Sequence, residues 1–155
     1  MSLDISHNRL LRIEDSTFLR LSRLSLLDLS HNTELVLETR GRSFKGLEDS
    51  LLELHLCNTS LGSMPELLLP ALRTLHLAQN HIQDIPVEVA RSLNSLQQLD
   101  VSYNQLRVCP LSKLSTTTRP ITHPQLKLAH NQFPSVNSYP VLTHTATMIV
   151  TAKFS

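Results

Sequence analysis

The stretch LDLSHNTEL at residues 27–35 decides the fold, because its order of apolar and polar positions returns along the chain. The related segments are LDISHNRLLRI (3–13), LHLCNTSLGSM (54–64), LHLAQNHIQDI (75–85), LDVSYNQLRVC (99–109) and LKLAHNQFPSV (126–136). All of them fit the pattern L-x-L-x-x-N-x-L-x-x-I. Self-similarity of this length predicts a repeat architecture, in which each coil buries its apolar face against the next.

The asparagine of the pattern defines a ladder position that occurs once in each coil. It is held by Asn8, Asn32, Thr59, Asn80, Asn104 and Asn131. The steps between them are 24, 27, 21, 24 and 27 residues, within the roughly 20–29 residues that are typical of leucine-rich repeats. An asparagine amide at this position can donate to backbone carbonyls that would otherwise be buried without a partner. Thr59 has a single hydroxyl donor, so we expect an irregular third coil, with Asn58 taking over the role if the register slips.

Alternating leucines such as Leu27 and Leu29 predict a short strand whose apolar side chains point inward while the residue between them faces out. The stretches FLRLSRL (18–24) and VARSLNSL (89–96) favour a helical turn, whereas Pro65 and Pro86 favour extended or 3-10 connections. The sequence therefore predicts an α/β leucine-rich repeat solenoid. We expect a curved horseshoe segment with a short parallel β-sheet on its concave face, and loops, 3-10 turns or short helical turns on its convex face.

The domain boundaries follow the repeat. Residues 1–136 are expected to form an array of about six coils, and residues 137–155 a non-repeat tail that either adds a last strand or is disordered. Residues 33–50 carry an insertion that should lengthen the convex side. The chain has only 3 glycines, so we expect stacked asparagines, instead of glycines with positive φ, to shape the turns. Because the chain begins inside a repeat and neither end has a cap, we expect a piece of a longer array.

Composition narrows the classes of partner. Lysine and arginine number 14 against 13 acidic residues, so no strong field draws the chain to nucleic acid or an anionic membrane. No apolar stretch is long enough to span a bilayer, and no secretory leader is recognised. Cys57 and Cys109 are too few for a disulfide framework or a zinc site, and they should lie two coils apart as free thiols. We expect a protein partner, no small-molecule substrate and no cofactor.

Residues facing out of the sheet form two columns. The central column is Asp4, Asp28, His55, His76, Asp100 and Lys127. The second column is His7, His31, Asn58, Gln79, Tyr103 and His130. Imidazoles between carboxylates suit zinc, but a nearly flat, open sheet favours a solvated polar face, so we expect no metal.

We interpret part of these columns as the centre of a protein-binding patch, since amphipathic rings are common where proteins touch. Its members are Asp28, His55, His76, Asp100 and Tyr103. The alternative is that LDLSHN is simply the common form of this repeat. Cys57 near His55 has no positioned base or oxyanion hole, so we expect no enzyme activity. Asn58-Thr59-Ser60 is a candidate N-glycosylation site.

The unit L-x-x-L-x-x-L-D-L-S-H-N-x-L-x-x-I-x-x-x-x-F-x-x-L, seen from Leu21 to Leu47, resembles the typical class of leucine-rich repeat found in extracellular receptors and adhesion proteins. The segments 41–56, 63–80 and 85–106 are more similar to the irregular coils of the chaoptin family of arthropod photoreceptor adhesion proteins. That resemblance implies cell-surface adhesion on the extracellular side of the plasma membrane, a lipid (GPI) anchor outside this chain, and homophilic contact. The alternative is a cytoplasmic scaffold or regulatory subunit built from the same repeat.

Overall fold

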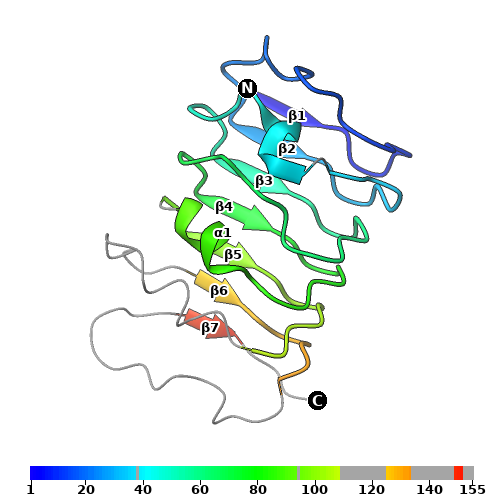
Figure 1. The fold of residues 1–155 in the computed structure, drawn as a ribbon, viewed down its shortest axis with the longest axis vertical. Coiled ribbons are helices and arrows are strands. Elements are labelled where there is room, and N and C mark those ends of the chain that lie inside the picture. The colour runs from blue at the N-terminus through cyan, green and yellow to red at the C-terminus, as the bar shows by residue number, and fades with distance from the viewer. Residues whose placement is uncertain (38, 94, 109–124, 134–148, 152–155) are drawn as a thin grey trace.

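The structure is a computed structural model that describes residues 1–37, 39–93, 95–108, 125–133 and 149–151. Its one sheet has seven parallel strands in chain order, and each strand pairs with the next. They are β1 (Ser2–Asp4), β2 (Leu26–Asp28), β3 (Glu53–His55), β4 (Thr74–His76), β5 (Gln98–Asp100), β6 (Gln125–Lys127) and β7 (Ile149–Thr151). The strands lie one beside another along the length of the molecule (Figure 1). The predicted leucine-rich repeat solenoid is confirmed.

The register places equivalent residues of successive coils opposite each other. Leu27 of β2 pairs with Leu54 of β3, and Leu54 with Leu75 of β4. These leucines, and Leu29, Leu56 and Leu77 two residues further on, are completely buried. Burying a leucine side chain contributes about 1.5–3 kcal/mol. The alternation of inward leucines with outward polar residues therefore produces the apolar core and fixes which side chains line the opposite face.

The connections supply the other wall of the core. The 3-10 helix η1 (Thr39–Phe44) occupies the long β2–β3 connection, and the helix α1 (Val87–Ser92) begins after Pro86 in the β4–β5 connection. The buried rings of Phe18 and Phe44 stack with their centroids 6.4 Å apart. Gly46 follows η1 with a φ of 97°, and a Cβ atom there would lie 2.7 Å from Leu19 Cα. Glycine is therefore required where the insertion packs back on the first connection.

The turn after each of the strands β1 to β6 has a left-handed residue directly before the ladder position. The φ values are 52° at His7, 61° at His31, 50° at Asn58, 60° at Gln79, 54° at Tyr103 and 56° at His130. Glycine is absent from these turns, as expected. The positive φ angle is carried by residues with side chains, directly before the ladder residues.

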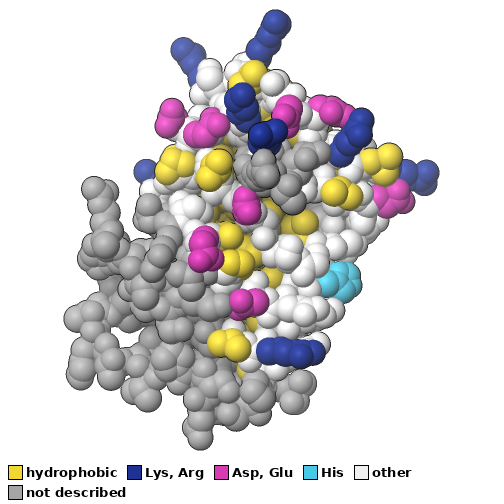
Figure 2. All heavy atoms as spheres, in the orientation of Figure 1, with side chains coloured by type: hydrophobic (Ala, Val, Ile, Leu, Met, Phe, Trp, Pro, Cys, Tyr) yellow, Lys and Arg dark blue, Asp and Glu magenta, His cyan; other side chains and the backbone are white. Residues whose placement is uncertain are grey.

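Strand β7 extends the sheet beyond β6, while residues 134–148 and 152–155 lie outside the described residues, so the boundary at residue 136 stays a prediction. None of the helices in the described part of the chain is long and apolar enough to cross a membrane. On the face shown in Figure 2, Lys and Arg side chains project mainly from the end that carries β1 and β2, with Asp and Glu beside them.

Candidate functional site on the concave sheet

The ladder residues tie each coil to the one before it. Asn32 Nδ2 donates to the carbonyl of Leu29 in its own coil at 2.8 Å and to that of Ile5 in the preceding coil at 3.1 Å. Its Oδ1 accepts from the backbone N of Leu10 at 3.1 Å. Asn80, Asn104 and Asn131 make the equivalent bonds within and between coils. Because these residues are largely buried, the network satisfies backbone groups that water cannot reach.

Two ladder positions depart from this pattern. Asn8 is exposed and donates only to carbonyls of its own coil, those of Ile5 and Ser6. Thr59 is buried at the ladder position, and its hydroxyl donates to the Leu56 carbonyl at 2.9 Å. Asn58 therefore does not replace it. The third coil has one fewer side-chain donor than its neighbours.

The aspartates of the central column close the turn that follows their strand. Oδ1 of Asp28 accepts from the backbone N of Ser30 at 2.8 Å, and Asp4 and Asp100 bind the serine two residues later in the same way. Hydrogen bonds from Ser6 lower the pKa of Asp4. Burial acts to raise the pKa of Asp28, but hydrogen bonds from Ser30 and the contact with His55 outweigh it, so the pKa lies below 3.8. The hydrogen bonds of the turn therefore favour the ionised form of Asp4 and Asp28.

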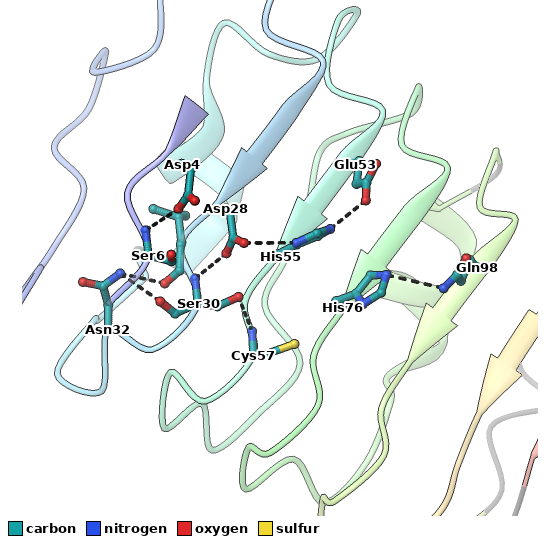
Figure 3. A network of polar contacts seen from close by, with 11 residues as sticks. Asp4, Ser6, Asp28, Ser30, Asn32, Glu53, His55, Cys57, His76 and Gln98 are labelled. Carbon is teal, nitrogen blue, oxygen red and sulfur yellow. Dashed lines mark hydrogen bonds and ion pairs between the residues drawn. The ribbon is translucent and has the colours of Figure 1, made fainter. Parts of the chain in front are cut away.

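The two histidines of the central column lie side by side, as the columns predict. The ring centroids of His55 and His76 are 4.6 Å apart, on adjacent strands in direct register. His55 lies between two carboxylates, with Nδ1 3.2 Å from Asp28 Oδ2 and Nε2 2.7 Å from Glu53 Oε1 (Figure 3). Burial, and next the neighbouring His55, lower the pKa of His76. The neutral form of His76 is thus favoured.

Glu53 is the residue of this cluster that the column analysis missed. It precedes His55 by two positions on β3, and residues two apart on a strand face the same side of the sheet. The signal was therefore present in the spacing, but the first outward residue of each strand was not considered. At the other side of His76, the amide Nε2 of Gln98 lies 3.4 Å from His76 Nε2.

Asp100 and Tyr103 lie further along the sheet. Asp100 pairs in register with His76, is 8% exposed, and accepts a salt bridge from Lys127 Nζ at 3.4 Å. Tyr103 is 52% exposed and stacks on His130, with ring centroids 4.2 Å apart. Asp28, His55, His76 and Asp100 thus form one continuous row, while Tyr103 belongs to the left-handed column beside it.

Cys57 and Asn58 end the third strand. Burial raises the pKa of the free Cys57 thiol, which disfavours the nucleophilic thiolate. Asn58 is half-buried, and its Nδ2 lies 3.1 Å from His31 Nδ1. Glycosylation of Asn58 stays a prediction, and Cys109 lies outside the described residues.

The sequence of this chain is similar to several known proteins with leucine-rich repeats. The sequence model of a family described as leucine rich repeat matches residues 1–61 and 70–115. Chaoptin of Drosophila melanogaster is 41% identical over 143 residues, which cover 87% of this chain and 10% of that protein. Chaoptin of Tribolium castaneum is 39% identical over 93% of this chain and 17% of its own length. Keratocan of Mus musculus is 31% identical over 88% of this chain and 39% of its own length. The resemblance predicted from the repeat unit is confirmed, and the chain spans a minor part of each relative.

Proposed function

The chain belongs to the leucine-rich repeat family, and from this premise we propose that it is a module of cell-surface adhesion or recognition that binds a protein partner through its concave sheet. Repeats of this family indicate protein interaction. The similarity to chaoptin over most of the chain supports the adhesive role. We place the module on the extracellular side of the plasma membrane, with homophilic contact as its mode of binding.

One observation carries the proposal: a row of outward side chains is mounted on a rigid hydrogen-bonded ladder. The row joins the half-buried His55 and His76 to the acidic groups of Asp28 and Asp100, and the exposed ring of Tyr103 lies beside it. A preorganised surface loses little side-chain freedom on binding. Aromatic rings next to polar groups are frequent at the centres of interfaces. The surface is therefore suited to a protein ligand and has no feature that demands a chemical reaction.

The test is an aggregation assay with this chain coupled to beads. We expect the beads to cluster, and Tyr103→Ala to weaken the clustering by about tenfold or more, the effect of losing an interface anchor worth 1.4 kcal/mol or more. The matched control is Leu68→Ala, which removes a 58% exposed side chain in the β3–β4 connection, away from the sheet. Equal effects of the two substitutions would place binding elsewhere, and beads that never cluster would remove the homophilic part of the proposal.

The proposed extracellular location is tested separately, through glycosylation of the sequon at Asn58. When the chain is directed into the secretory pathway, a glycosidase-sensitive mass shift that Asn58→Gln removes would support extracellular use. A secreted chain without the shift, together with full binding activity when made in the cytosol, would favour the intracellular scaffold.

A further inference from the structure

We propose that Glu53, His55 and His76 form a binding site for a divalent transition-metal ion of the zinc class on the concave face. Each residue offers one ligand atom, and these atoms lie within 4.8 Å of one another. This departs from our sequence expectation of no metal, which considered only Asp28 and Asp100 as carboxylate ligands. The structure supplies a different carboxylate, Glu53, on the same strand as His55.

The sheet register brings the three ligands to one point. His55 and His76 pair directly across β3 and β4, and Glu53 reaches along β3 to contact His55 Nε2 at 2.7 Å. Zinc binds imidazole nitrogen and carboxylate oxygen at about 2.0–2.2 Å in a tetrahedron, which requires ligand atoms a little over about 3 Å apart. The proposal therefore requires the Glu53 side chain and the His76 ring to rotate toward the ion.

Asp28 orients the first histidine for this role. Its Oδ2 faces His55 Nδ1 at 3.2 Å and can keep accepting the Nδ1 proton, so Nε2, on the Glu53 side, is the nitrogen that a cation would take in place of a proton. A carboxylate behind a metal-bound histidine is a recurrent arrangement that fixes the tautomer and strengthens the ligand. Asp28 is itself fixed by Ser30. It is therefore a positioning residue and not a ligand.

His76 offers the lone pair of its Nε2. The amide nitrogen of Gln98 can only donate, so the neighbouring His76 Nε2, 3.4 Å away, acts as an acceptor. The contact is long and weak, and a cation that takes this lone pair displaces only the Gln98 amide. Three protein ligands leave a fourth position open toward solvent or a bound partner.

The sequence contains a matched comparison. His7 and His31 lie in the turns after β1 and β2, and their rings also stack, with centroids 4.0 Å apart and nearly parallel. Within the described residues, the only group of three candidate ligands found is the one around His55 and His76. If two neighbouring imidazoles were sufficient, both pairs would bind metal. The carboxylate of Glu53 predicts that only one pair does.

The experiment is calorimetric titration of the metal-stripped chain with Zn²⁺, followed by absorption spectroscopy with Co²⁺. We expect a single saturable site with tetrahedral Co²⁺ bands. His55→Ala and His76→Ala should abolish binding, and Glu53→Gln should weaken it strongly. Asp28→Asn should weaken it about 10- to 100-fold, as outer-sphere partners do. The double variant His7→Ala/His31→Ala should leave it unchanged.

Three outcomes would overturn the site: no saturable binding by the parent chain, binding retained in both single histidine variants, or binding lost only in the double variant. Circular dichroism shows that each variant is folded before it is titrated. The assay measures metal binding and not bead clustering, so its failure leaves the proposed function untouched.

Discussion

Aspartate and histidine occupy the same central-column position in different coils, yet their side chains make different contacts there. We call these coils the aspartate coils, with Asp4, Asp28 and Asp100, and the histidine coils, with His55 and His76. In the aspartate coils the carboxylate turns back to bind the serine two residues later. The histidine coils have Cys57 and Ala78 at the serine position, and their imidazoles contact neighbouring strands instead.

The backbone conformation of the turn therefore does not depend on the aspartate. Asn58 and Gln79 reach the same left-handed conformation as His31 and Tyr103 without it. The ladder, which runs through both kinds of coil, holds the turn. Central-column side chains are then free for other contacts wherever no serine follows them.

The largest effect is expected at the ladder. Asn80→Ala removes donors to the Leu56 and Leu77 carbonyls and leaves the buried backbone N of Thr59 without its acceptor. An unsatisfied buried group costs about 1–3 kcal/mol, so the free energy of unfolding should fall by about 3 kcal/mol or more in a urea titration. The control Asn8→Ala, at the exposed end of the ladder, should cost less than about 1 kcal/mol. Equal losses would mean that the ladder does not hold the turns.

An intermediate effect should separate the two kinds of coil. Asp100→Ala removes the acceptor for Ser102 N at 3.0 Å and Ser102 Oγ at 2.6 Å, and should destabilise the chain by about 1–2 kcal/mol. His76→Ala removes no turn contact and should change stability by about 0.5 kcal/mol or less. The same urea titration measures the free energy of unfolding of both variants. A larger loss for His76→Ala than for Asp100→Ala would reverse our assignment of which coils use the position structurally.

A smaller change of opposite sign is expected in the irregular third coil. Thr59→Asn restores an amide at a buried ladder position, where Oγ1 now serves only the Leu56 carbonyl and the Asn80 Oδ1. The added donor should stabilise the chain by up to about 1 kcal/mol, seen as a higher melting temperature. Thr74→Asn, on the solvent side of β4, is the control and should not stabilise. A destabilised Thr59→Asn variant would show that this coil is shaped around threonine.

The smallest effect concerns pH. The pKa of His76 in the folded chain lies below 6.5 because of burial and then His55, so below about that pH the unfolded chain binds more protons and stability falls as the pH is lowered. Of the charged groups around His76, His55 and Lys127 lower its pKa, whereas Asp100 and Glu53 act to raise it. His76→Gln should flatten the slope of unfolding free energy between pH 7.5 and 5.5, whereas the exposed control His81→Gln should not. An unchanged slope in His76→Gln would contradict the shift.

The sequence predicted most of the architecture and part of the site. The spacing of leucines and ladder residues gave the parallel sheet and the neighbouring positions of His55 and His76, because a repeat converts sequence distance directly into strand register. The outward direction of Glu53 follows from its place two residues before His55, but its contact with His55 depends on how far the side chain reaches along the strand, which the spacing does not contain. The turn contacts of Asp28 and Asp100 were also missed, since they depend on the backbone direction after the strand.

The left-handed residue before each ladder position has a consequence for how this surface can change. A residue with φ between 50° and 61° strongly disfavours side chains that branch at Cβ, and the six present are histidine, asparagine, glutamine and tyrosine. The second column thus draws on a restricted alphabet and aims each member in a common direction, which is why His7 lies on His31 and Tyr103 on His130. To change the binding specificity of the concave face by design, the central column can be varied widely, whereas the second column should be varied only among side chains that do not branch at Cβ.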